Sequence, residues 1–185
     1  MREKLLGAEH PHTLISMGNL ASTYHYQGKL NEAEKLEVQI LDIRKRLLGT
    51  KHPDTLTGMG NLARIYYHQG KLNEAEQLGV QILDIRNELF GAKHPDTLTS
   101  MGDLARAYYH QGKFNEAEQL EVQVLDIRKK LLGAEHPHTL ITMGNLASTY
   151  CQQGKLSEAE QLEVQILDMR KKLLIADSAE HAGEI

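Results

Sequence analysis

The stretch HPDTLTGMGNLARIYYHQGKLNEAEQLGVQILDIRNELFG, from His52 to Gly91, carries the signals that decide the fold. It opens with a His-Pro pair, has the tripeptide Gln-Gly-Lys at Gln69 and ends on a glycine. Proline favours the first position of a helix and glycine the position just past its end, so this order predicts two helices joined by a turn. A β-propeller blade would need short alternating strands, whereas the apolar spacing here is helical and the chain has no tryptophan.

The same unit recurs through the 185-residue chain at a step of 42 residues. Residues 8–49 and 134–175 differ at 8 of 42 positions, so 34 are identical. Such units usually stack, because one alone cannot bury its apolar face. We expect the end of a preceding helix at 1–7, four units at 8–49, 50–91, 92–133 and 134–175, and a C-terminal tail at 176–185.

The first helix of each unit, helix A, is expected to follow the His-Pro pair. In the first unit this predicts a helix from Pro11 to near Gly28. Its apolar stripe recurs at steps of three and four residues. The stripe consists of Leu14, Met17, Leu20, Ala21 and Tyr24.

The second helix, helix B, is expected to start at a capping box. Asn31 can accept from a first-turn amide while Glu34 reaches back, and the pattern returns in each later unit. The helix should end at Gly49, which gives roughly 18 residues and about 27 Å. Its apolar stripe consists of Ala33, Leu36, Ile40, Leu41, Ile43 and Leu47.

The order Leu20, Ala21, Tyr24, Gly28 and Ala33 closely resembles the tetratricopeptide repeat (TPR), and the quoted stretch is similar to the long repeats of kinesin light chains. The resemblance implies an all-α fold, a right-handed α-solenoid of four helix-turn-helix TPR units with a 42-residue period. The family commonly has a tyrosine in the middle of helix B. The residues at that position here are Glu37, Gly79, Glu121 and Glu163.

The resemblance also implies a concave groove, lined by the A helices, that binds a peptide or protein segment. Most groove positions vary between copies while the predicted core hardly changes, which fits a recognition surface or exposed positions that drift freely. The expected groove residues are Asn19, Ser22, His25, Tyr26, Asn61, Arg64, Tyr67, His68, Asp103, Arg106, Tyr109, His110, Asn145 and Ser148.

The two central units each have an arginine and a tyrosine among their expected groove residues. Arg64 precedes Tyr67 by three residues, and Arg106 stands in the same relation to Tyr109, so each pair shares one helix face. A guanidinium beside an aromatic ring suits an acidic or aromatic peptide. The alternative is that each arginine is used internally, for example in an ion pair with Asp103.

A glycine interrupts each helix A, where it costs about 1 kcal/mol relative to alanine. Close approach of neighbouring A helices would offset that cost, and room for a ligand backbone is the alternative. The asparagine or aspartate that follows each glycine could form a polar ladder for an extended peptide, or satisfy loops and caps. The glycines are Gly18, Gly60, Gly102 and Gly144.

No catalytic, cofactor or metal site is expected, so the protein is predicted not to be an enzyme. His10 and His12 flank a helix-starting proline without a third ligand, and Cys151 has no base nearby in the sequence. A formal charge of -4 argues against nucleic-acid binding. No apolar run is long enough for a bilayer, and one cysteine fits a reducing compartment, so a cytoplasmic location without membrane contact is expected.

Self-association is the competing function. Solenoid ends without polar caps expose apolar stripes, which favours head-to-tail stacking or a swapped terminal helix. The chain would then be a homo-oligomeric spacer or sensor array of a larger signalling protein. The sequence alone leaves this choice open.

Overall fold

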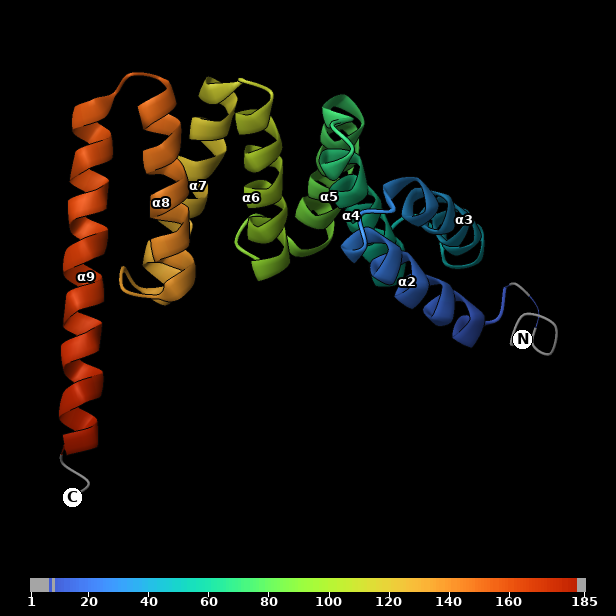
Figure 1. Cartoon of the computed structure of the whole chain (residues 1–185), viewed down its shortest axis with the longest axis horizontal. Helices are drawn as coiled ribbons and strands as arrows, with labels where there is room; N and C mark the ends of the chain where they lie inside the picture. The colour runs from blue at the N-terminus through green and yellow to red at the C-terminus, as the bar shows by residue number, and fades with distance from the viewer. Residues whose placement is uncertain (1–6, 8, 183–185) are drawn as a thin grey trace. The chain divides into compact units, whose positions relative to one another are not determined.

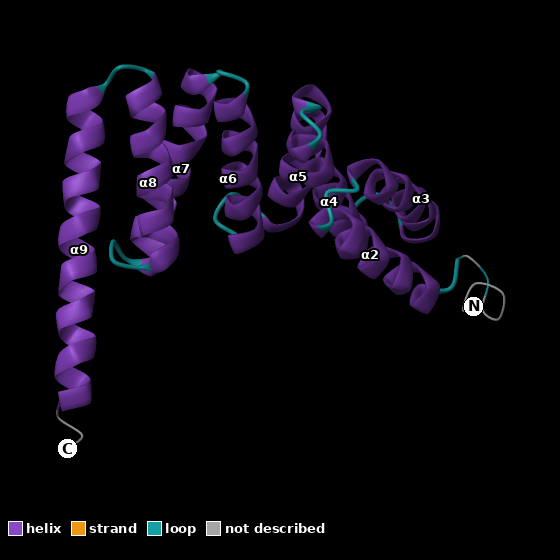
Figure 2. Ribbon diagram, in the orientation of Figure 1, coloured by secondary structure: helices purple, strands orange, loops and turns teal. Residues whose placement is uncertain are grey.

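The computed structural model describes the backbone of residue 7 and residues 9–182, with side chains through Leu174. All secondary structure in this part of the chain is helical (Figure 2). None of these helices is long and apolar enough to cross a membrane. The helix end expected at residues 1–7 lies, apart from Gly7, outside the described residues.

The chain divides into two compact units, Met1–Gly91 and Ala92–Ile185. Within each unit, helices that follow one another in sequence pack against each other (Figure 1). Unit 1 contains α2 (Pro11–Tyr26), α3 (Leu30–Leu48), α4 (Pro53–His68) and α5 (Leu72–Phe90). Unit 2 contains α6 (Pro95–His110), α7 (Phe114–Leu132), α8 (Pro137–Gln152) and α9 (Leu156–Ala182).

Every helix A begins at the proline of its His-Pro pair, as predicted. The preceding histidine is the N-cap: in α2, Nδ1 of His10 accepts a hydrogen bond of 3.2 Å from the backbone N–H of His12. The cap satisfies one of the amides that a helix start leaves without a partner. The repeated histidines therefore have a structural role at the helix starts.

Every helix A ends in the same glycine turn. Gly28 has φ +74°, a conformation that only glycine adopts at little cost. The N–H of Lys29 donates to the carbonyl of Tyr24 at 2.9 Å, and that of Gly28 to the carbonyl of His25 at 3.0 Å. These two bonds form a Schellman motif, which stops the helix and reverses the chain.

The predicted capping box at the start of helix B is wrong. Helix α3 begins at Leu30 with Lys29 as its N-cap, and no side chain caps it. Asn31 therefore already lies inside the helix. Its side chain and that of Glu34 bind residues of the following repeat, as described below.

Each unit has one apolar core, between a helix B and the next helices A and B. In unit 1 it consists of Leu41, Leu56, Met59, Leu62 and Ile82, and in unit 2 of Leu125, Leu140, Met143, Leu146 and Ile166. Burying such a side chain contributes about 1.5–3 kcal/mol.

Two residues expected in the core are exposed. Leu20 is 42% exposed although its counterpart Leu62 is buried, because no described helix packs against that face of α2. Leu47 is 52% exposed, and its counterpart Leu131 is 54% exposed, so this position is on the surface of helix B.

Helix α9 continues well beyond the length of the other B helices. Helix α3 ends at Gly49, with φ +86°, and a proline follows shortly after. The corresponding residue after Leu174 is Ile175, and no proline follows it. Because both stop signals are missing, α9 has 27 residues and includes most of the segment expected as a tail.

Candidate peptide-binding face

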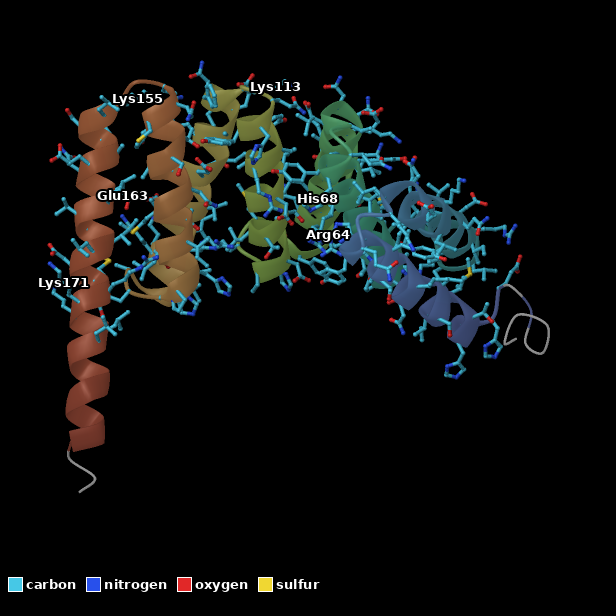
Figure 3. All side chains as sticks on the ribbon, viewed as in Figure 1. Arg64, His68, Lys113, Lys155, Glu163 and Lys171 are labelled. Atoms are coloured by element: carbon cyan, nitrogen blue, oxygen red, sulfur yellow. The ribbon has the colours of Figure 1, made fainter. Side chains whose placement is uncertain are left out.

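Three nitrogen-rich side chains gather where α2 lies beside α4 in unit 1. The rings of His25 and His68 meet edge to face, with centroids 4.9 Å apart. Arg64 lies one turn before His68 on α4 (Figure 3). We refer to His25, Arg64 and His68 as the histidine-arginine cluster.

Burial and nearby positive charge disfavour the protonated form of His25. Burial lowers the pKa of its imidazole, and the nearby charges of Arg64 and His68 lower that pKa further. Both ring nitrogens are shielded from solvent and have no hydrogen-bond partner among the described residues. The exposed side chains of Arg64 and His68 are therefore the ones that an incoming acceptor oxygen can reach.

Tyrosine rings border the histidine-arginine cluster. Tyr26 is 82% exposed and meets His25 edge to face at 5.6 Å. Tyr67 meets His68 in the same way at 5.2 Å. An exposed tyrosine on a rigid helix offers an apolar surface with a polar tip, which is a common anchor for a bound peptide.

The two groove arginines differ in their partners. In unit 2, Nη2 of Arg106 donates to Oδ1 of Asp103 at 2.8 Å, the internal pairing that was the alternative for this residue. Position 61 is asparagine instead of aspartate, so Arg64 lacks the corresponding partner. Within the described part of the chain, Arg64 forms no ion pair.

The remaining predicted residues of unit 2 have other contacts. Tyr109 meets His110 at 5.2 Å and Phe114 at 5.6 Å. The hydroxyl of Ser148 donates to the carbonyl of Gly144 within α8, at 3.0 Å. Asn145 is exposed.

The predicted polar ladder is only partly available to a ligand. Asn61 points into the α3–α4 interface, where its Nδ2 donates to Oε1 of Glu37 at 3.2 Å. Asp103 is used by Arg106. Asn19 is exposed, and Ser22 is half-buried.

The glycines of helix A are not explained by close packing. A Cβ atom added at Gly18, Gly60, Gly102 or Gly144 would meet nothing within 4 Å. The preferred explanation from sequence, close approach of neighbouring A helices, is therefore wrong within each unit. Open space beside the glycines remains consistent with room for a ligand backbone.

Two buried carboxyl groups escaped the sequence reasoning. Glu37 is 2% exposed and Glu121 is 5% exposed, each facing the next helix A. Burial raises both pKa values, that of Glu121 to about 7 although the Thr149 hydroxyl offsets part of the rise. The replacement of the usual tyrosine by glutamate was visible, but nothing in the sequence showed that the carboxylates are buried.

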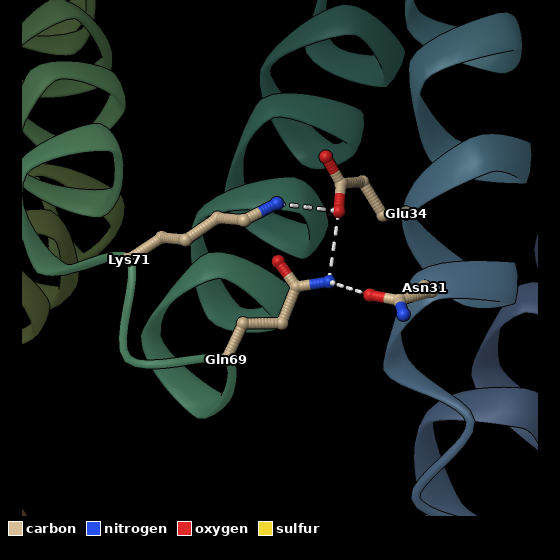
Figure 4. A network of polar contacts seen from close by, with 4 residues as sticks. All are labelled: Asn31, Glu34, Gln69 and Lys71. Atoms are coloured by element: carbon tan, nitrogen blue, oxygen red, sulfur yellow. Dashed lines mark hydrogen bonds and ion pairs between the residues drawn. The ribbon is translucent and has the colours of Figure 1, made fainter.

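A second group of polar contacts joins consecutive repeats. In unit 1, Nε2 of Gln69 donates to Glu34 at 2.8 Å and to Asn31 at 3.2 Å, and Nζ of Lys71 donates to Glu34 at 2.8 Å (Figure 4). We call this arrangement the inter-repeat clamp. The same clamp in unit 2 consists of Asn115, Glu118, Gln153 and Lys155.

Lys71 makes two electrostatic contacts in the clamp. The hydrogen bond from Lys71 lowers the pKa of Glu34. Nζ of Lys71 also lies 5.2 Å from the ring centroid of Tyr66, a cation-π contact. Gln69 and Lys71 of the Gln-Gly-Lys tripeptide therefore hold consecutive repeats together.

Within the described residues, no group of three or more histidine, cysteine, aspartate or glutamate side chains could hold a metal ion. Cys151 is an exposed free thiol.

Family models of the tetratricopeptide repeat match residues 13–54, 38–88, 54–130 and 122–172. The chain belongs to the tetratricopeptide-repeat family. This agrees with the helix pairs and glycine turns described above, and with the resemblance seen in the sequence.

Solved structures narrow the similarity to kinesin light chain-like TPR proteins. A kinesin light chain-like protein of Podosopora anserina, with nearly identical TPR-like repeats, is 35% identical with a TM-score of 0.83. The match covers 93% of this chain and 82% of that one. A single-substitution variant of the same protein matches with a TM-score of 0.85, 35% identity and coverage of 94% and 82%.

A more distant structure shares the TPR fold. BtubC (BKLC) from P. vanneervenii is 21% identical with a TM-score of 0.79, covering 87% of this chain and 64% of that one. The comparison with curated proteins found no match. TPR proteins generally act as protein-interaction scaffolds, so a TPR chain with an exposed aromatic and basic face is a candidate for the same task.

Proposed function

We propose that this TPR protein is a non-enzymatic scaffold that binds an acidic peptide segment on the helix A face of unit 1. The observation that carries the proposal is Arg64, a guanidinium without an ion pair in the described structure, set beside two histidines. A carboxylate is a group that Arg64 and His68 could bind together.

The chemistry of the histidine-arginine cluster favours an anionic ligand. A guanidinium binds a carboxylate through two parallel hydrogen bonds. His68 is exposed beside Arg64, so its imidazole can donate a further hydrogen bond to the same ligand. A bound carboxylate would also counter the repulsion by Arg64 and His68 that lowers the pKa of His25.

The bordering tyrosines favour a ligand that also has an apolar or aromatic side chain. Tyr26 is the most exposed of the large apolar residues in the described structure. It continues the surface that begins at His25. A segment in which acidic and aromatic residues alternate would contact Arg64 and Tyr26 together.

The experiment compares Arg64→Ala with Arg106→Ala, using fluorescein-labelled peptides of alternating glutamate and tyrosine. A charge-assisted hydrogen bond contributes about 1.5–3 kcal/mol, so Arg64→Ala should weaken binding by about tenfold or more. Arg106→Ala is the matched control, because its guanidinium is already paired with Asp103. Its affinity should stay near that of the unaltered protein.

A peptide in which lysine replaces glutamate serves as the ligand control and should not bind. Equal loss of affinity in both arginine variants would show that unit 1 is not the preferred binding site. Unchanged affinity in Arg64→Ala would show that the histidine-arginine cluster does not bind the peptide.

A further inference from the structure

The outward face of α9 repeats the face of α7 that packs on α8. Residues 114–132 and 156–174 are identical at 15 of 19 positions. On α7, Leu125 is 7% exposed because it packs against Leu140 and Met143 of α8. On α9, the corresponding Leu167 is 52% exposed, and Glu163 is also exposed (Figure 3).

Helix α2 carries the complementary face. It is identical to α8 at 13 of 16 positions. On α8, Leu146 is 3% exposed and Thr149 is fully buried. The corresponding Leu20 is 42% exposed, and Thr23 is exposed.

The polar contacts between α7 and α8 also have counterparts on α9 and α2. Nη1 of Arg128 donates to the carbonyl of His138 at 3.2 Å and to the hydroxyl of Thr142 at 2.7 Å. These contacts fix the position of α8 along α7. The corresponding groups are Arg170 on α9 and the carbonyl of His12 on α2.

Residues that correspond to the inter-repeat clamp also lie on both faces, one on α9 and two in the turn after α2. In unit 2, Glu118 accepts from Gln153 at 2.8 Å and from Lys155 at 2.7 Å. The residue of α9 that corresponds to Glu118 is exposed. The corresponding residues are Glu160 at the start of α9, and Gln27 and Lys29 after α2.

We propose that α9 of one molecule binds α2 of a second copy, in the way that α7 binds α8. The interface is heterologous, since two different faces meet, and each molecule keeps one face of each kind. Association is therefore head to tail. All the contacts that define it lie between Glu160 and Arg170 of α9, before that helix passes the length of α7.

A second copy fits this face better than an unrelated apolar helix. Any apolar helix could cover Leu167, but it would leave Glu160 and Arg170 partly desolvated without partners, which is costly. Helix α2 and the turn after it supply counterparts for Leu167, Glu160 and Arg170. This inference uses the packing faces of α2 and α9 and is independent of the proposed peptide site at Arg64.

The test measures mass by sedimentation equilibrium across a wide range of protein concentration. The unaltered 20.8 kDa chain should rise in average mass as its concentration increases. Leu167→Glu and Leu20→Glu should each leave the chain monomeric, because either change removes one of the two faces from every molecule. Leu131→Glu is the matched control, since Leu131 is 54% exposed at a surface position, and it should associate like the unaltered chain.

Mixing the two variants gives a sharper result. The Leu20→Glu chain keeps an intact α9 face and the Leu167→Glu chain an intact α2 face, so an equimolar mixture should form a one-to-one complex and stop there. Two further single variants, Glu160→Lys and Lys29→Glu, should each weaken association by placing like charges at the junction. In their mixture both junctions between unlike chains pair opposite charges, so association should be restored.

Three outcomes overturn the proposal. A monomer at all concentrations does so directly. A dimer that survives Leu20→Glu but not Leu167→Glu indicates α9 pairing with α9 instead. Failure of the mixed variants to associate, with helicity retained in both, would show that the two faces do not recognise each other.

Discussion

Asn61 on α4 donates a hydrogen bond of 3.2 Å to the buried carboxyl group of Glu37 on α3. Glu37 is 2% exposed, and burial raises its pKa while the Asn61 bond and the charges of Arg44 and Arg64 lower it. Asn61 is thus the contact that makes an acidic residue tolerable inside unit 1.

Asn61→Ala should destabilise the protein, because it removes that donor from a buried carboxyl group. The expected loss is about 1–3 kcal/mol in the free energy of unfolding, measured by urea denaturation. Asn145→Ala is the matched control, since Asn145 is exposed on α8, and it should change stability by less than about 0.5 kcal/mol. Equal losses in both variants would contradict the assigned role of Asn61.

Glu121→Gln should change how stability depends on pH. The folded pKa of Glu121 is raised from 4.5 to about 7, so its contribution to stability is complete below pH 4.5 and is lost as pH rises through 7. The shift corresponds to at most about 3 kcal/mol. The glutamine variant should therefore be more stable than the unaltered protein at pH 8, with little difference at pH 4.

Glu163→Gln provides the control for that titration. Glu163 occupies the same position on α9 but is exposed. In dilute solution its replacement should leave the stability profile between pH 4 and pH 8 unaltered within error. If both glutamates changed the profile alike, burial of Glu121 would not be the cause.

Gln153→Ala should weaken the inter-repeat clamp of unit 2. Its amide donates to Asn115 and Glu118, so the loss should be about 1–2 kcal/mol by denaturant titration. The hydrogen bonds from Lys155 and Gln153 lower the pKa of Glu118, so the clamp stabilises above pH 4.5 and fades as pH falls. Gln27→Ala, whose side chain is exposed, should have little effect on stability.

Gly60→Ala should stabilise the protein by about 1 kcal/mol, because alanine is the better helix former and nothing lies within 4 Å of the added methyl group. Gly70→Ala should do the opposite, since φ is +75° there. Thermal melting of the two variants decides this. A destabilised Gly60→Ala chain would mean that the open space is occupied in solution.

The helix boundaries were predictable because their signals are local. A proline sets the start of each helix A, and Gly28 and its repeats set the turn after it. The family resemblance followed from the same residues and is confirmed by the family models. These signals act through the backbone of a few neighbouring residues, which a sequence shows directly.

The errors came from contacts between residues far apart in sequence. Asn31 and Glu34 have the spacing of a capping box, but their partners Gln69 and Lys71 lie 38 and 37 residues away. The exposure of Leu20 has the same origin, because it depends on which helix covers α2.

The near-identity of α2 and α8 also bears on how the chain refolds. Helix α7 presents a surface that either helix would fit, so the native contacts alone do not fix the order of the repeats. The connection to α8 is residues 133–136, whereas α2 is separated from α7 by residues 27–113. Closing the longer loop costs about 2–3 kcal/mol more, roughly a hundredfold in population. The short connection, more than the residues it joins, keeps the repeats in register, and its lengthening would turn a single native order into competing ones.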